Sequence, residues 1–92
     1  MSDVELSQAA QLYRCLIDCR LALEAGEKDF DKLAETAQRQ LESAGFTRDY
    51  FNICRQDDLQ LATSADTALV VVAAAYLGKA RLIDNIRLQL AL

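Results

Sequence analysis

The sequence predicts an α+β domain in which two antiparallel amphipathic helices pack on a small, mainly antiparallel three-stranded sheet with a C-terminal hairpin. Apolar residues recur at helical spacing through the first half of the chain. After Gly45 the pattern becomes strand-like, and a two-residue turn signal separates two apolar runs near the C-terminus. The 92 residues are expected to form one domain, 1–92.

The first helix is expected from about Asp3 to Ala25. Ser2 and Glu5 have the spacing of a capping box, in which both side chains satisfy free amides at a helix start. The apolar positions at helical spacing are Leu12, Leu16, Cys19 and Leu23. Gly26 follows the last apolar turn and is a natural helix stop.

A second helix is expected after Asp29, because an aspartate at the N-cap accepts a hydrogen bond from a free amide. Asp31 suits the positive end of the helix dipole, and Gly45 ends the helix. Its apolar stripe consists of Phe30, Leu33, Ala34, Ala37, Leu41 and Ala44. The short connection between the two helices predicts antiparallel packing.

Three strands are expected in the second half of the chain. The aromatic and β-branched content of Asp49–Arg55 is typical of a strand. Residues 56–66 are polar and predict a turn, with room for one short helical turn. Ala68–Tyr76 is an almost unbroken apolar run, and its three consecutive valines favour a central strand over a helix.

Gly78 and Lys79 form a turn signal, so Ala80–Gln89 is expected to return as the partner strand. Alternation places Leu82, Asp84 and Ile86 on one face, and Arg81, Ile83, Asn85 and Arg87 on the other. Several polar side chains therefore lie inside an apolar stretch, where burial without a partner is unfavourable. The hairpin is the best candidate for a role beyond packing.

Composition disfavours several classes of function. The net charge is −4 and the basic residues are scattered, so no nucleic-acid partner is expected. No segment reaches the roughly twenty apolar residues of a membrane span, and the acidic N-terminus is unlike a signal peptide. We therefore expect no membrane partner and a cytoplasmic location. The chain contains no histidine, and no nucleophile–base pair can be assembled, which disfavours an autonomous small enzyme.

The three cysteines predict buried thiols rather than a disulfide or a metal site. Cys15 and Cys19 share a helical face, but no histidine or Cys-x-x-Cys motif accompanies them to complete a zinc site. Asp57 and Asp58 are expected in a solvated turn, because magnesium needs more converging oxygens than this stretch provides. No metal site is expected.

The hairpin sequence from Gly78 to Ile86 resembles the C-terminal signature of the pantothenate synthetase (pantoate–β-alanine ligase) family. The likeness extends in order over essentially the whole chain: Leu12-Tyr13-Arg14 in the first helix, Gly45 followed by Asp49-Tyr50, and Leu59 after an acidic turn. Ala80 departs from the family, which usually has threonine or another small polar residue there.

The resemblance implies the lid domain of an ATP-dependent ligase. Enzymes of this family activate pantoate with ATP and magnesium to a pantoyl adenylate, which β-alanine attacks to give pantothenate, AMP and pyrophosphate. Their nucleotide and pantoate sites belong mainly to an N-terminal nucleotidyltransferase domain, whose histidine-containing and Ser-Ser-Arg-Asn motifs are absent from this sequence. The chain would then be inactive alone, with that domain as its partner in a homodimeric parent enzyme.

A closing lid excludes water and protects a reactive adenylate from hydrolysis. On this interpretation Lys79 and Arg81 are candidate contacts on the nucleotide side of the cleft, where cations offset developing charge. Plainer roles stay open: a solvated turn for Lys79, and a tie from the sheet to a helix or domain edge for Arg81. Asp84 would cap a turn or amide cluster, Asn85 would bridge backbone groups at a strand end, and Tyr50 would pack between sheet and helix.

A second function class also stays open. A free-standing module with the same fold would bind a protein partner through an exposed apolar surface. In either case Gly78, Asp84 and Asn85 are expected to be structural members of the hairpin motif, and no catalytic residue is expected within the chain.

Overall fold

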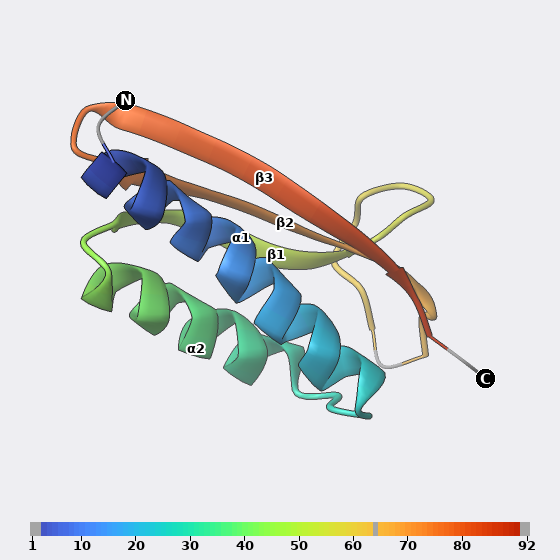
Figure 1. Cartoon of the computed structure of the whole chain (residues 1–92). Coiled ribbons are helices and arrows are strands. Elements are labelled where there is room, and N and C mark those ends of the chain that lie inside the picture. The colour runs from blue at the N-terminus through green and yellow to red at the C-terminus, as the bar shows by residue number, and fades with distance from the viewer. Residues whose placement is uncertain (1–2, 64, 91–92) are drawn as a thin grey trace.

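The computed structural model describes residues 3–63 and 65–90 as a three-stranded sheet with two helices on one face (Figure 1). The elements are α1 (Asp3–Glu24), α2 (Phe30–Ser43), β1 (Thr47–Arg55), β2 (Ala68–Leu77) and β3 (Ala80–Gln89). The strands pair in the order β1-β2-β3, and both pairings are antiparallel. The predicted α+β class is confirmed.

Local signals end the helices as predicted. Asp29 accepts a hydrogen bond from the backbone N–H of Lys32 at 3.1 Å, which confirms it as the N-cap of α2. Gly26 and Gly45 follow the two helices with φ values of +105° and +97°. The capping box predicted for α1 includes Ser2, which lies outside the described residues. Neither described helix has both the length and the apolar content needed to cross a membrane.

The core lies between the two antiparallel helices and one face of the sheet (Figure 1). On the central strand, Leu69, Val71, Ala73 and Ala75 face the helices and are fully buried. They pack with helix residues that are also almost inaccessible to solvent: Leu12, Leu16, Leu23, Ala37 and Leu41. The alternation of side chains along β2 therefore fixes which face of the sheet the helices cover.

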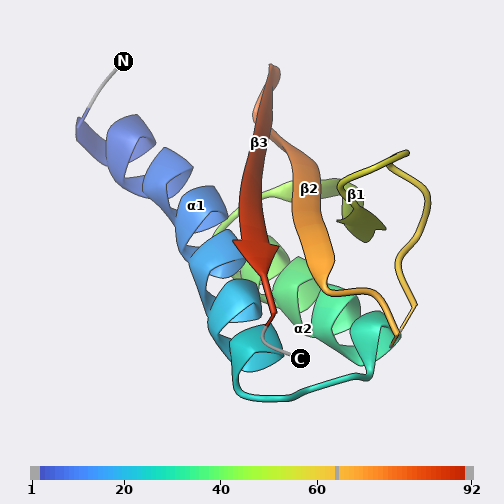
Figure 2. The same cartoon turned by 90° about the vertical axis from the view of Figure 1, so that its right-hand side faces the viewer.

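Neither helix covers the opposite face of the sheet (Figure 2). We call this the helix-free face; it comprises Tyr50, Asn52, Val70, Val72, Ala74, Tyr76, Arg81, Ile83, Asn85 and Arg87. The predicted alternation along β3 is confirmed, because Ile86 is buried toward the helices whereas Ile83 is 60% exposed on the helix-free face.

The β2–β3 hairpin turns through Gly78 and Lys79, as predicted. Gly78 has φ = +62° at the first central position, which is the feature of a type II′ turn. A Cβ built on Gly78 would meet nothing within 4 Å, so the positive φ alone favours glycine there. The turn thus fixes the register of β2 against β3.

Residues 56–63 and 65–66 lie in the predicted turn, at the opposite end of the molecule from the hairpin (Figure 1). A single α-turn is closed by the N–H of Leu59, which donates to the carbonyl of Arg55 at 3.0 Å. Leu59 has φ = +59°, and Leu61 forms an isolated bridge with Cys54. The loop therefore folds back along the outer edge of β1.

Candidate functional site

A β-bulge in β1 brings two consecutive side chains to Arg81 on the helix-free face. The pairing partners of Arg48 and Tyr50 on β2 are consecutive residues, so Asp49 is the extra residue of the bulge. A bulge leaves one residue unpaired and re-aims the neighbouring side chains. Asp49 and Tyr50 both contact Arg81, which belongs to β3, two strands away.

Arg81 is held by these two contacts. Its Nε donates to Oδ2 of Asp49 at 2.7 Å, and its guanidinium carbon lies 5.9 Å from the centre of the Tyr50 ring. The hydrogen bond to Asp49 raises the pKa of Arg81 above its ordinary value. The side chain remains 43% exposed. The tie expected between Arg81 and a helix or domain edge is instead a tie from β3 to β1 across the central strand.

Lys79 is exposed in the hairpin turn, close in sequence to Arg81. It forms no ion pair with any side chain in residues 10–63 or 65–90. Apart from the Arg48 pairs on the α2 side, the hairpin end thus carries two cations, Lys79 and Arg81, and one bonded carboxylate, Asp49, in a chain whose net charge is −4. Such a local excess of positive charge attracts anionic groups.

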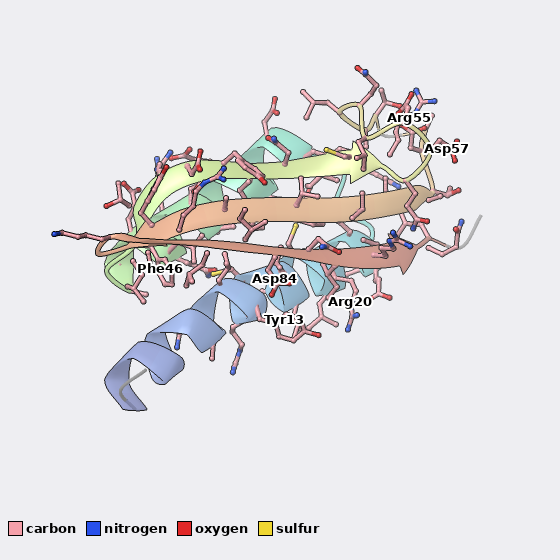
Figure 3. All side chains as sticks on the ribbon, turned by 90° about the horizontal axis from the view of Figure 1, so that it is seen from above. Tyr13, Arg20, Phe46, Arg55, Asp57 and Asp84 are labelled. Carbon is pink, nitrogen blue, oxygen red and sulfur yellow. The ribbon has the colours of Figure 1, made fainter. Side chains whose placement is uncertain are left out.

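Asp84 and Asn85 lie on opposite faces of β3. Asp84 is half-buried on the side of β3 that faces α1 (Figure 3), and its Oδ1 accepts a hydrogen bond from the backbone N–H of Asn85 at 2.8 Å. Because Arg81 is on the other face, it does not pair with Asp84, as expected. The position predicted for Asn85 at a strand end is wrong: Asn85 pairs with Val72 midway along β3, an edge strand of the sheet.

Tyr50 does not pack between the sheet and a helix, contrary to expectation. Phe51 and Ile53 take the helix-facing positions of β1 and are 3% and 4% exposed, so alternation turns Tyr50 to the other face. The apolar–polar–apolar pattern from Phe51 to Ile53 is the signal that could have placed it. On the helix-free face the ring finds the Arg81 guanidinium as its partner.

Arg48, also next to the bulge, is bonded to α2. Its Nε donates to Glu42 at 2.8 Å, while Nη1 and Nη2 donate to the two carboxylate oxygens of Glu35 at 3.0 and 2.8 Å. Bonds from Arg48 and Arg39 lower the pKa of Glu35 to about 2. No sequence pattern signals this cluster, because only the fold brings Glu35 and Arg48 together.

A second ion-pair group organises the loop between β1 and β2. Arg55 lies 3.6 Å from Asp58 and 3.9 Å from Asp66. Arg55 and Asp57 are at the end of the sheet opposite Phe46 and the hairpin (Figure 3). The acidic turn is therefore remote from Lys79. Within the described ranges, no three metal-ligating side chains converge.

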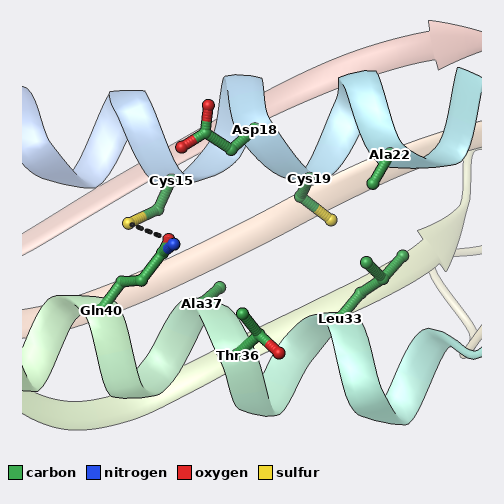
Figure 4. Close-up of a pocket in the computed structure, with 8 residues that line it drawn as sticks. All are labelled: Cys15, Asp18, Cys19, Ala22, Leu33, Thr36, Ala37 and Gln40. Atoms are coloured by element: carbon green, nitrogen blue, oxygen red, sulfur yellow. Dashed lines mark hydrogen bonds between the residues drawn. The ribbon is translucent and has the colours of Figure 1, made fainter. Parts of the chain in front are cut away.

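A small pocket of about 140 Å³ lies between the helices and is lined by Cys15 and Cys19 (Figure 4). The burial expected for the cysteines is confirmed. The thiol of Cys15 donates to Oε1 of Gln40 at 3.6 Å, and burial raises the pKa of Cys19 to about 12. Burial also raises the pKa of Cys15, and a raised pKa disfavours the nucleophilic thiolate.

The hairpin lies within a longer stretch that matches a known family. A family model described as pantoate-beta-alanine ligase matches residues 1–87. The chain belongs to the pantoate–β-alanine ligase family. This match confirms the resemblance seen in the hairpin sequence.

The curated relatives are pantothenate synthetases. The chain is 44% identical over 90 residues to the protein of Pseudomonas fluorescens strain Pf-5, and 41% identical over 90 residues to that of Methylococcus capsulatus. Each alignment covers 98% of this chain but 32% of the relative. The matched segment is a C-terminal portion of those proteins.

A solved structure shows the same fold. Pantothenate synthetase from Thermus thermophilus superposes with a TM-score of 0.80, covering 94% of this chain and 31% of that chain. The sequence identity is 24%, so this likeness concerns the fold alone.

Proposed function

We propose that this chain acts as the C-terminal lid domain of a pantothenate synthetase. The parent enzyme would condense pantoate with ATP to a pantoyl adenylate and pyrophosphate, and β-alanine would then displace AMP to give pantothenate. Its partner would be an N-terminal nucleotidyltransferase domain, in a cytoplasmic homodimer. The family match over residues 1–87, combined with coverage of 32% of the relatives, supports this proposal most directly.

The position of the hairpin supports a lid role. The β2–β3 turn and the first turn of α1 lie at the same end of the molecule (Figures 1 and 3). Since the chain matches a C-terminal portion of its relatives, the rest of a relative's chain connects at the segment matching the start of α1. Lys79 and Arg81 therefore lie at the end nearest that connection.

Closure of this end over a reaction site would bring Lys79 and Arg81 to the nucleotide side of the cleft. Exclusion of water strengthens electrostatic contacts and protects the adenylate from hydrolysis. Negative charge develops on the departing pyrophosphate, and the two cations would offset it. The chain's own residues thus bind and orient an anion, and the groups that make and break bonds belong to the N-terminal domain.

The described residues do not fit a magnesium site. Asp49 is bonded to Arg81, whereas Asp58 and Asp66 are paired with Arg55. No group of three acidic or other ligating side chains converges in the described ranges. Magnesium therefore belongs with the N-terminal domain in this proposal.

A second candidate is a free-standing protein-interaction module. Large apolar side chains on two separate surfaces favour it: Tyr13 and Leu21 on α1 are 47% and 54% exposed, and Ile83 on the sheet is 60% exposed. The same side chains suit contacts with a parent enzyme. The two candidate functions differ in whether this chain supports pantothenate formation when it is joined to the rest of a relative.

The test is a chimera in which this chain replaces the matched C-terminal portion of the Pseudomonas fluorescens pantothenate synthetase. We expect the chimera to form pantothenate from pantoate, β-alanine and ATP, and the 92-residue chain alone to form none. A folded chimera without activity contradicts the proposal, as does product formed by the chain alone.

A lysine pair sharpens this test. Lys79→Ala in the chimera should lower the rate while leaving Tm unchanged, because Lys79 is exposed and forms no ion pair in the described part of the chain. Lys28→Ala is the matched control, since Lys28 is also exposed but belongs to the connection between α1 and α2, at the opposite end of the molecule from the hairpin (Figure 1). Unchanged kinetics for Lys79→Ala would leave Lys79 as a solvated turn residue.

A further inference from the structure

We propose that Asp49 and Tyr50 are positioning residues, which hold the Arg81 guanidinium so that its two terminal amino groups bind a pair of anionic oxygens on the substrate. The inference rests on the proposed function in one respect, because it needs the hairpin end to close over a reaction site. Beyond the proposed function, the inference names the residues that orient Arg81 and the donors of Arg81 that contact the ligand.

The hydrogen-bond donors of Arg81 are only partly used. Its Nε donates to Asp49, and its Nη1 and Nη2 form no hydrogen bond within the described part of the chain. A guanidinium presents its donors in a rigid plane that matches the two oxygens of a phosphate or carboxylate. Arg81 therefore retains the part of its fork that is suited to bidentate recognition.

Two restraints set the direction of the free donors. The 2.7 Å bond from Asp49 fixes the Nε edge of the guanidinium, and the Tyr50 ring lies 5.9 Å from its central carbon. A planar group restrained at one edge and on one face has less rotational freedom than an unrestrained one before a ligand arrives. Pre-ordering of this kind reduces the entropy lost on binding.

The bulge supplies both restraints from adjacent residues. Asp49 is the inserted residue and Tyr50 is the next one, yet both reach Arg81 on the same face. In a regular strand, adjacent side chains point to opposite faces. Bulges are over-represented beside active sites, where they re-aim a side chain.

The local charge also suits an anion. Lys79 and Arg81 contribute two positive charges, and Asp49 contributes one negative charge. Asp84 lies on the other face of β3, toward α1 (Figure 3). The hairpin end of the helix-free face therefore carries a net positive charge, even with Asp49 bonded to Arg81.

Arg48 and Glu42 provide a matched control. Asp49 accepts a hydrogen bond from Nε of Arg81 at 2.7 Å, and Glu42 accepts one from Nε of Arg48 at 2.8 Å. Asp49→Asn and Glu42→Gln each remove one such carboxylate charge. The two variants differ in whether the arginine has unused terminal amino groups.

The first experiment measures both variants in the chimera. We expect Asp49→Asn to lower kcat/KM by about tenfold, which corresponds to the loss of one hydrogen bond to a charged group. Glu42→Gln should keep the kinetics of the parent chimera, and the two variants should have similar Tm values. Asp49→Glu, which keeps the charge, should recover part of the loss. Kinetics for Asp49→Asn equal to those of Glu42→Gln would overturn the inference.

The substrate dependence identifies the source of the oxygens. A rise in KM confined to ATP assigns them to a phosphate group, whereas a rise confined to pantoate or β-alanine assigns them to that carboxylate. Either result supports bidentate recognition by Arg81. A fall in kcat/KM that follows Tm across all the variants would show a purely structural tie and would also overturn the inference.

A second readout does not depend on the chimera. In ¹⁵N relaxation of the 92-residue chain, we expect the Arg81 Nε–H to be as ordered as that of Arg48, and to become mobile in Asp49→Asn but not in Glu42→Gln. A mobile Arg81 Nε–H in the unmodified chain contradicts the positioning role. An inactive chimera with an ordered Arg81 would instead count against the proposed function alone.

Discussion

Arg48 and Arg81 are both anchored beside the same β-bulge, but they use their donors differently. Arg48 bonds to α2 through Nε, Nη1 and Nη2, with Glu42 and Glu35 as acceptors. Arg81 bonds to Asp49 through Nε alone, among the residues described. All three guanidinium nitrogens of Arg48 are thus bonded inside the domain, whereas Nη1 and Nη2 of Arg81 have no hydrogen bond in the described residues.

The two faces of the sheet differ in the same way. The helix-covered face carries Leu69 and Val71, which are fully buried. The helix-free face carries Tyr76 and Ile83, which are 39% and 60% exposed. We infer that the covered face provides most of the stability, and that the helix-free face is where substitutions can alter function without unfolding the domain.

The largest effect is expected from truncation on the covered face. Leu69→Ala should lower the free energy of unfolding by about 2–5 kcal/mol, because the side chain is fully buried in the core. Ile83→Ala should cost less than about 1 kcal/mol, since Ile83 is mostly exposed. Urea unfolding measures the free energy of unfolding of both variants. Equal decreases in the two variants would contradict the assignment of the core to one face.

A smaller effect separates the two arginines. Arg48→Lys should lower Tm more than Arg81→Lys, because lysine cannot reproduce the bidentate bonds that Arg48 makes to Glu35. Arg81 makes one bond in the described chain, so its replacement removes less. Thermal unfolding of the two variants under the same conditions tests this order of Tm values. A larger decrease in Tm for Arg81→Lys would contradict it.

Acid should weaken the Arg48 cluster. The pKa of Glu35 falls from an ordinary 4.5 to about 2 in the folded state, chiefly through its bond from Arg48. The carboxylate therefore stabilises the fold fully above pH 4.5, and this contribution is lost as the pH falls toward 2. The Tm difference between the unmodified chain and Glu35→Gln should shrink over that range.

The control for this titration is the same pair of measurements in an Arg48→Met background. The pH dependence of the Glu35→Gln effect should be much weaker there, because the main partner of the carboxylate is gone. A Glu35→Gln effect that is independent of pH with Arg48 present would contradict the ion-pair assignment.

The smallest effect concerns the loop beside β1. Leu59 has φ = +59°, a conformation that disfavours side chains with a Cβ, and it is 64% exposed. Leu59→Gly should therefore raise stability, by less than about 1 kcal/mol. Leu61→Gly is the control, because Leu61 is 69% exposed but is not in the left-handed region. A loss for Leu59→Gly larger than for Leu61→Gly would show that the Leu59 side chain packs.

Local signals predicted most of the fold. Asp29 at the start of α2, Gly45 after it and Gly78 in the hairpin each act within a few residues, so their chemistry can be read directly from the chain. The alternation along β3 placed Arg81 and Asp84 on opposite faces for the same reason.

The contacts of the candidate site could not be predicted in this way. The Asp49 bulge adds one residue to a strand without changing its composition, and it moves a carboxylate next to Arg81, 32 positions away. The face of Tyr50 was predictable from the apolar–polar–apolar pattern of Phe51 to Ile53, but its contact with Arg81 was not, because Arg81 lies on another strand. Only tertiary structure combines these residues into one cluster.

The most direct test of a functional role for the hairpin end is the kinetics of Arg81→Lys and Arg48→Lys in the chimera. If Arg81 contacts the reacting complex, Arg81→Lys should lower kcat/KM by about tenfold or more, and it should lower Tm less than Arg48→Lys does. Arg48→Lys should keep the kinetics of the parent chimera. An Arg81→Lys chimera with parental kcat/KM would contradict the role of the hairpin end.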